Sequence, residues 1–207
     1  MAAASPVVNT HMICTILQQQ GSKNICSFTS RTTNKRLRNK IEWSNILAPI
    51  ANRHVNFLDP TNNWFLDPTW NSFIKEHTQQ YHFDLCIGTS MGAFGALLYS
   101  EVINADHYIL FAPQAFVNKQ RWDRIGEKHR LWSQCLSEHH NYQFLTKSSQ
   151  NISMVYSRYH EDQEHIEQFT RLGYTVEYVE TENHTVAYAL AEQNMLLDFV
   201  LSKCKME

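Results

Sequence analysis

Short apolar runs alternate along this chain with longer segments in which apolar and polar positions recur at helical spacing. Runs of strand length and composition cover residues 11–18, 24–28, 54–58, 83–87, 105–112, 152–157 and 174–179. Segments with a helical pattern cover residues 44–51, 69–81, 93–99, 161–172 and 185–203. Because strands followed by helices build parallel sheets, the sequence predicts an α/β fold with a doubly wound, mostly parallel sheet flanked by helices.

Two regions depart from this simple alternation. The first two strands are separated only by a polar turn at residues 19–22, so they could form a hairpin. Residues 114–150 carry no strand signal and place large apolar residues among charges, which indicates roughly two or three short helices. The 207 residues are expected to form one domain, residues 1–207, with a short helical cap inserted at about residues 114–150.

A serine stands between two glycines where the strand at 83–87 passes into a helix. Gly88, Ser90 and Gly92 have the G-x-S-x-G spacing of a nucleophile elbow. A side chain at either glycine would collide with the neighbouring strand or helix, and the sharp turn raises the serine hydroxyl above the sheet. The helix that follows directs free N–H groups and a positive partial charge at the same place.

A serine hydroxyl is a poor nucleophile unless a base removes its proton. Reactive groups in a doubly wound sheet lie at the carboxyl ends of strands, and two later strands supply them. Glu161 and Asp162 follow the strand at 152–157, and His184 follows the last strand. The pattern therefore offers an orienting acid and a base in the order serine, acid, histidine, with either acidic neighbour open as the acid.

With GTSMG at the elbow, an acid after the penultimate strand and a histidine after the last one, the chain resembles the α/β-hydrolase superfamily. The resemblance covers most of the chain, from about residue 24 to the C-terminus. It implies Ser90 as the nucleophile, Asp162 as the orienting acid and His184 as the base. The chain is short for this superfamily and looks like a reduced core with a small cap.

The resemblance also implies an oxyanion site. The backbone N–H of Met91 would receive the oxyanion together with one from Thr29 or Ser30. Here the chain departs from the common pattern, because no His-Gly pair follows the strand at 24–28. The second donor is therefore left open between the two neighbours.

Several of these residues admit other interpretations. The cluster of His160, Glu161, Asp162 and His165 could bind a metal, although its spacing matches no strong ligand motif. A basic run follows the oxyanion segment and is either a solvated face or a rim that attracts an anionic substrate. Its members are Arg31, Lys35, Arg36, Arg38 and Lys40. Three tryptophans are expected to pack in the core or under the cap, namely Trp64, Trp122 and Trp132.

Composition limits the expected partners and cellular location of the protein. The formal net charge of −2 gives no sign of a nucleic-acid partner, and no apolar stretch has the length of a membrane span. The cysteines show no C-x-x-C pair, which fits a reducing compartment; they are Cys14, Cys26, Cys86, Cys135 and Cys204. Cys26 and Cys86 fall in strands and are expected in the core. With no secretory signal visible, a cytoplasmic location is expected.

Three functions from different classes fit these residues. The first is a serine hydrolase that cleaves an ester or thioester through an acyl-enzyme. The second is an acyltransferase that uses the same triad and delivers the acyl group to a sugar hydroxyl. The third is a binding module that keeps the fold without catalysis. The expected partner is a small-molecule ester or thioester, anionic or carbohydrate-linked, and neither a cofactor nor a metal is expected.

Overall fold

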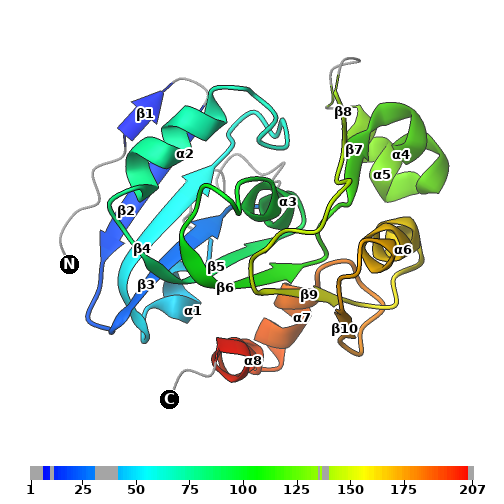
Figure 1. Ribbon diagram of the computed structural model, residues 1–207. Coiled ribbons are helices and arrows are strands. Elements are labelled where there is room, and N and C mark those ends of the chain that lie inside the picture. Colours follow the sequence, from blue (N-terminus) through cyan, green and yellow to red (C-terminus); the bar gives the residue numbers. More distant parts are fainter. Residues whose placement is uncertain (1–6, 10–11, 31–41, 135, 137–139, 205–207) are drawn as a thin grey trace.

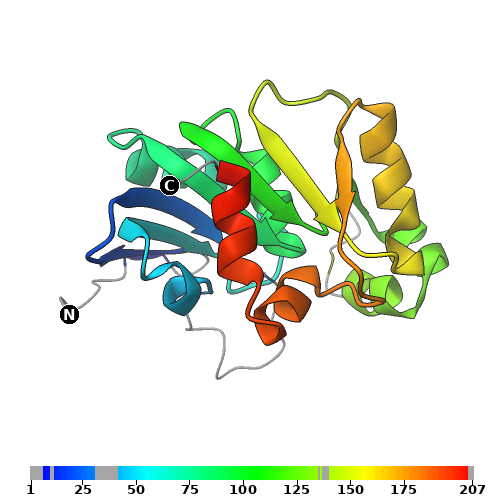
Figure 2. The same ribbon diagram turned by 90° about the horizontal axis from the view of Figure 1, so that it is seen from below.

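The computed structural model describes residues 7–9, 12–30, 42–134, 136 and 140–204. In this part of the chain, eight strands form one sheet that carries helices on both faces (Figures 1 and 2). The strands, in the order in which they lie across the sheet, are β1 (Val7–Asn9), β2 (Met12–Gln18), β4 (Ala51–Leu58), β3 (Lys23–Phe28), β5 (Phe83–Thr89), β6 (Ala105–Phe111), β9 (Ile152–Tyr156) and β10 (Val176–Tyr178). Neighbours from β4 to β10 are parallel, whereas β2 is antiparallel to β1 and β4. The predicted doubly wound, mostly parallel sheet is confirmed.

Side chains of the central strands enter two cores in alternation, one on each face of the sheet. On β5, Cys86 lies in the larger core, while Leu85 and Ile87 lie in the smaller one. The larger core is covered by α2 (Trp70–Thr78), α3 (Met91–Leu98) and α6 (Gln163–Arg171), and the smaller by α1 (Ser44–Leu47), α7 (Val186–Glu192) and α8 (Leu196–Cys204). Burial on both faces explains why the strands read as continuous apolar runs in the sequence.

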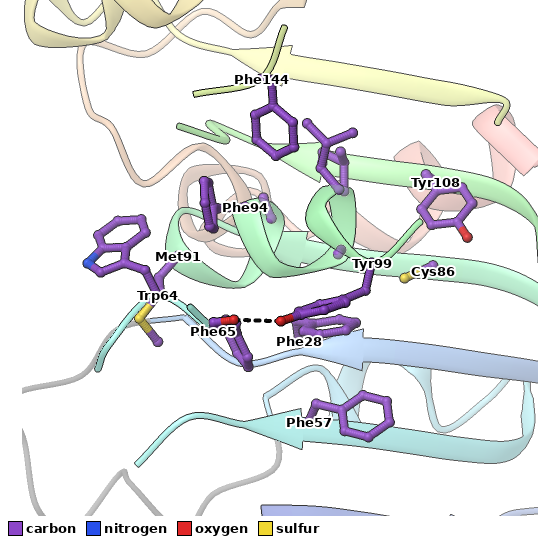
Figure 3. Packing of buried hydrophobic residues seen from close by; sticks show 14 of the residues in the cluster. Phe28, Phe57, Trp64, Phe65, Cys86, Met91, Phe94, Tyr99, Tyr108 and Phe144 are labelled. Carbon is purple, nitrogen blue, oxygen red and sulfur yellow. Dashed lines mark hydrogen bonds between the residues drawn. The ribbon is translucent and has the colours of Figure 1, made fainter. Parts of the chain in front are cut away.

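Aromatic rings fill the larger core between α3 and the sheet (Figure 3). Phe28 packs on Phe57 and on Phe65, with 5.2 Å between ring centroids in each pair. The Tyr99 hydroxyl donates to the carbonyl oxygen of Phe65 at 2.7 Å, which satisfies its polar end (Figure 3). A Cβ on Gly95 would come within 2.6 Å of the Phe65 ring. The close approach of α3 to these rings therefore leaves no room for a side chain at Gly95.

The predicted hairpin between residues 11–18 and 24–28 is wrong. β2 pairs with β4, and β3 lies on the other side of β4, where it pairs in parallel with β4 and β5. The turn between them is tied to the start of β4, since Gly21 N donates to Ala51 O and Ser22 N to Ile50 O. β3 is buried from Ile25 onward, and a strand buried on both faces belongs among parallel neighbours at the centre of a sheet.

The single C-terminal helix predicted at 185–203 is also wrong, because two helices occupy this segment. Asn194 adopts a left-handed conformation, with φ of 56°, just after α7. Its N–H donates to Ala191 O at 3.0 Å, and the Met195 N–H donates to Leu190 O at 2.9 Å. These two bonds form a Schellman motif, which ends α7 before α8 begins in a new direction.

The region at 114–150 contains the short helices that were predicted, α4 (Lys119–Ile125) and α5 (Glu127–Ser133). The expectation that it holds no strand is wrong, because β7 (Phe116–Asn118) pairs antiparallel with β8 (Asn141–Gln143). Strands this short leave no alternating pattern to detect. Together these elements lie at one end of the main sheet, beside α6 (Figure 1).

Two further expectations concern residues of the core and the surface. Cys26 and Cys86 are fully buried free thiols, as predicted, whereas Cys135 falls outside the described residues. Among the helices that the structure describes, none combines the length and apolar character that crossing a membrane requires.

Candidate active site

Ser90 sits on a strained turn between β5 and α3. Its φ of 51° and ψ of −119° are rare for a residue with a side chain. A Cβ on Gly88 would lie 2.6 Å from the backbone of Gly92, and one on Gly92 would lie 2.2 Å from the carbonyl oxygen of Phe28. The Ser90 N–H donates to Phe111 O at 2.8 Å and ties the turn to β6. The geometry is the strand–turn–helix context that a nucleophile elbow requires.

The structure brings Ser90, His184 and Asp162 into one chain of hydrogen bonds. His184 Nε2 lies 2.9 Å from Ser90 Oγ, and His184 Nδ1 lies 2.8 and 2.9 Å from the two Asp162 oxygens. Asp162 ends the short 3-10 helix η1 (His160–Asp162) after β9, and His184 comes from the loop between β10 and α7. Both are buried, with exposed fractions of 0% and 2%.

Proton positions in this chain follow from its acceptors. An ionised carboxylate can only accept, so Nδ1 of His184 carries the proton that bonds Asp162. Nε2 of the neutral ring is then left as an acceptor for the Ser90 hydroxyl. The arrangement places a proton acceptor on the one hydroxyl that the elbow raises above the sheet.

Glu161, the neighbouring acid that the sequence left open, faces away from His184. Its carboxylate accepts from the backbone N–H of Lys128 at 3.1 Å and lies 3.1 Å from His129 Nδ1. Burial opposes its ionisation, but the hydrogen bonds from His129 and Tyr159 hold the pKa of Glu161 below its usual range. Of the two acids, only Asp162 contacts the histidine beside Ser90.

Two buried histidines continue the network behind Glu161. His165 Nδ1 accepts from the backbone N–H of Ala115 at 3.1 Å, and its Nε2 lies 3.0 Å from His129 Nε2. A neutral His165 therefore donates through Nε2 to His129, which donates through Nδ1 to Glu161. Burial lowers the pKa of both histidines, which favours these neutral forms.

This arrangement argues against the metal cluster that the sequence left open. Asp162 is bonded to His184, Glu161 to His129, and His165 to His129 and the Ala115 backbone. Among the residues that the structure describes, no group of three histidine, cysteine or acidic side chains is placed to hold a metal ion.

The expected oxyanion donors differ in their availability. The Met91 N–H opens α3 directly after Ser90, where helix N–H groups have no intrahelical partner. The Thr29 N–H donates to Phe57 O at 2.9 Å and extends the sheet, so this N–H is already engaged. The Ser30 N–H donates to a carboxylate oxygen of Glu42 at 2.5 Å, and the Ser30 hydroxyl donates to the other oxygen at 2.9 Å.

The sequence did not identify Glu42 as a candidate site residue. Burial raises its pKa, and the two hydrogen bonds from Ser30 oppose that shift. Ser30 and Glu42 lie on either side of the basic run in the sequence, and no local sequence pattern predicts that they pair. That run, with Arg31, Lys35, Arg36, Arg38 and Lys40, lies outside the described residues.

Ser90 and His184 open into a cavity of about 380 Å³. Its other walls include Ser30, Glu42, Trp43, Lys128, Trp132 and Tyr188. Trp132 is buried in the larger core, as expected, and also forms part of this wall, with 5.0 Å between the centroids of its ring and the His184 ring. Trp64 and Trp122 are fully buried, as predicted. Lys128 and Tyr188 were missed, because their place at the cavity follows from packing between distant segments.

Comparisons with known proteins bear on the fold. No model of a protein family and no curated protein sequence matches the chain. Solved structures match it, among them the capsule O-acetyltransferase of Neisseria meningitidis serogroup A, with a TM-score of 0.68 and 15% identity over 99% of this chain and 96% of that chain. A mutant of that acetyltransferase in complex with CoA matches with a TM-score of 0.58 and 13% identity over 97% and 94% of the two chains.

A third similar structure is an alpha/beta hydrolase enzyme from the metagenome of sediments from the lagoon of Mar Chica, Morocco. It matches with a TM-score of 0.58 and 13% identity over 96% of this chain and 98% of that chain. At such identities the likeness shows the fold alone. The fold is that of the α/β-hydrolases, as the sequence resemblance implied.

Proposed function

We propose that this chain, which has the α/β-hydrolase fold, transfers an acyl group from an ester or thioester through a covalent intermediate on Ser90. One observation carries the proposal: the hydrogen-bond chain from Asp162 through His184 to Ser90 Oγ ends in the cavity of about 380 Å³. A strained serine, a base within 2.9 Å and a buried orienting acid are the parts that nucleophilic catalysis needs.

The first half of the reaction forms the acyl-enzyme. His184 Nε2 takes the proton of the Ser90 hydroxyl as Oγ attacks the carbonyl carbon, and the carbonyl electrons move to the oxygen. Asp162 holds the ring tautomer and stabilises the imidazolium through Nδ1. The tetrahedral intermediate then collapses, the bond to the leaving oxygen or sulfur breaks, and that atom takes the proton from His184.

The oxyanion formed in this step is received by the Met91 N–H at the start of α3, where the helix dipole adds a positive partial charge. The Ser30 N–H is the second donor in our proposal. The segment that carries it passes close to the elbow, since a Cβ on Gly92 would meet the Phe28 carbonyl oxygen. Because Glu42 holds this N–H, the carboxyl group must release it before Ser30 can act.

The second half returns the free serine. A water molecule or a hydroxyl of an acceptor gives its proton to His184 and attacks the acyl carbon. The ester bond to Ser90 Oγ breaks, and Oγ recovers a proton from His184. Water as the acceptor makes the protein a serine hydrolase, which is the function that we propose first.

Transfer to another hydroxyl is the second candidate. It is suggested by the likeness in fold to a capsule O-acetyltransferase, which matches this chain over nearly its full length. Tyr188 offers an aromatic ring at the cavity, 63% exposed, on which a sugar face could stack. Product analysis with and without a sugar acceptor separates the candidates, because a transferase yields the acylated sugar and little free acid.

A fluorophosphonate probe tests whether the site is catalytic at all. Wild-type protein should be labelled at Ser90, and Ser90→Ala should not be labelled although it remains folded. A panel of esters of increasing acyl length, with Ser90→Ala as its matched control, then defines the acyl group. Absence of labelling on the folded wild-type protein would favour a binding module that has kept the fold.

A further inference from the structure

We propose that the ammonium group of Lys128 recognises an anionic group of the substrate inside the cavity that holds Ser90. The proposal rests on the acyl-transfer function above and adds its substrate class, an ester or thioester that carries a phosphate or a carboxylate. Both groups offer oxygens with negative charge to a compact cation.

The position of Lys128 places this cation next to the reacting groups. Lys128 lies in the first turn of α5 and lines the cavity together with Ser90 and His184. Its Nζ lies 5.6 Å from the centre of the Trp132 ring and 5.3 Å from that of Tyr159. These two rings lie 5.0 and 6.3 Å from the His184 ring. The Trp132 or Tyr159 ring would therefore separate a group bound at Nζ from His184, the proposed base.

The ammonium has no anionic partner in the described part of the chain. None of the ion pairs or side-chain hydrogen bonds there involves Nζ, which lies over the faces of the two rings. The nearby acids bond elsewhere: Asp162 binds His184, and Glu161 binds the backbone of Lys128 and the His129 ring. Partial burial lowers the pKa of Lys128, and the charges of Asp162 and Glu161 oppose that shift. A partly desolvated cation without a partner is costly, and an anion from the substrate would offset that cost.

The other described residues that line the cavity present little negative charge to an incoming anion. Glu42 is the acidic side chain among the described lining residues, and both of its oxygens accept from Ser30. Burial raises the pKa of Glu42 and so disfavours its charged form. Lys128 thus makes the cavity a place that favours negative charge.

The network behind α5 holds Lys128 in place. Glu161 accepts from the backbone N–H groups of Lys128 and His129 at the start of the helix. His129 is held in turn by His165, at 3.0 Å between the two Nε2 atoms. A Cβ on Gly126 would come within 2.3 Å of the Glu161 carboxyl carbon, so the glycine admits this carboxylate. A fixed backbone reduces the entropy lost when the side chain binds a ligand.

Two matched pairs of substrates test the proposal and locate the anion. In the first pair, para-nitrophenyl valerate and mono-para-nitrophenyl glutarate have acyl chains of equal length, and only the second carries a carboxylate. In the second pair, S-acetyl-N-acetylcysteamine and acetyl-CoA share the acetyl thioester, and only the second carries phosphates. Preference within the first pair assigns the anion to the acyl side, and preference within the second assigns it to the leaving group.

Three variants accompany the substrates. Lys128→Met should raise KM for the preferred anionic member ~10-fold, equivalent to about 1.4 kcal/mol, and change that of its neutral partner less than ~2-fold. Lys128→Arg should retain most of the preference because it retains the charge. Arg130→Met removes a positive charge from the exposed face of the same helix and should leave all KM values unchanged. Equal effects of Lys128→Met on both members of each pair, or no preference in the wild-type protein, would overturn the proposal.

A binding measurement separates this proposal from the function on which it rests. Trp132 lies beside Lys128, so tryptophan fluorescence should report anion binding in the Ser90→Ala background without turnover. CoA and mono-methyl glutarate serve as the probes. At least one should bind Ser90→Ala and bind Ser90→Ala with Lys128→Met ~10-fold more weakly. Equal affinity for both proteins would refute the role of Lys128, whereas wild-type activity in Ser90→Ala would refute the acyl-enzyme and leave the binding result to stand alone.

Discussion

Glu42 holds the backbone N–H of Ser30 with one carboxyl oxygen, at 2.5 Å, and the Ser30 hydroxyl with the other, at 2.9 Å. The group that we propose as second oxyanion donor is therefore occupied in the free protein. If Ser30 is the second donor, Glu42 must release this N–H before the oxyanion can bind.

If Glu42 competes with the oxyanion, its removal should speed the reaction. Glu42→Ala is expected to raise kcat/KM for a neutral ester ~10-fold, since one such donor is typically worth about 3 kcal/mol and only part is gained. Glu42→Gln keeps a weaker, uncharged acceptor and should give a smaller rise. A fall in kcat/KM with unchanged thermal stability would mean that Glu42 assists the reaction and that Ser30 is not the second donor.

The acid of the site is tested by comparing two neighbours. Asp162→Asn should leave the fold intact and reduce kcat by as much as ~10⁴, because an amide favours the wrong tautomer of His184. Glu161→Gln is the matched change one residue away. It should lower stability, since His129 and the start of α5 keep only an uncharged, weaker acceptor, and it should leave far more activity. Steady-state kinetics beside thermal unfolding would contradict the assignment if Glu161→Gln were the more damaging change to kcat.

The buried histidines make stability depend on pH. Burial lowers the pKa of His54 to about 4, and it also lowers the pKa of His165. The unfolded chain binds these protons near pH ~6.5, whereas the folded chain binds them only at lower pH. The contribution is therefore present above ~6.5 and is lost as the pH falls, by up to about 1.4 kcal/mol per pH unit for each histidine.

Denaturant unfolding between neutral pH and pH ~4.5 measures this loss. His54→Asn should flatten the pH dependence, because one proton no longer distinguishes the folded from the unfolded state. His82 serves as a control site, since it is largely exposed and its pKa is raised by the hydrogen bond to Asp106. An unchanged slope in His54→Asn would contradict the buried neutral state of that residue.

The turn that carries Ser90 should tolerate no side chain at Gly92. A Cβ there would lie 2.2 Å from the Phe28 carbonyl oxygen, so β3 or α3 would have to move. We expect Gly92→Ala to cost more than about 3 kcal/mol of unfolding free energy. At Gly173 a Cβ would meet nothing, and only the φ of 88° opposes it. Gly173→Ala should therefore cost only about 1–2 kcal/mol, and an equal loss for both variants would contradict the packing argument.

Features that depend on short, local spacing were predictable from the sequence. Adjacent residues determine the strand, turn and helix around Ser90. Asp162 and His184 likewise each follow shortly after a strand that the local sequence predicts. The order of β2 and β3 was not predictable, because their partner β4 lies later in the chain and its pairing decides the topology. The same holds for the break at Asn194, which rests on a single left-handed residue.

Within the site, the sequence predicted the positions of the two acidic residues but not the directions in which their side chains point. Glu161 and Asp162 are neighbours, and the η1 turn sends one to His129 and the other to His184. Nothing in the sequence encodes that choice locally. Lys128 and Glu42 reach the cavity through contacts between segments far apart in the chain, so no spacing could have identified them.

Covalent trapping tests the acyl-enzyme on Ser90 most directly. Wild-type protein mixed with an activated ester and quenched with acid should show, by intact mass, the addition of one acyl group. Peptide mapping should place that group on Ser90, and Ser90→Ala should show no addition under the same conditions. Turnover of the ester without any adduct, or an adduct on another residue that persists in Ser90→Ala, would contradict the account.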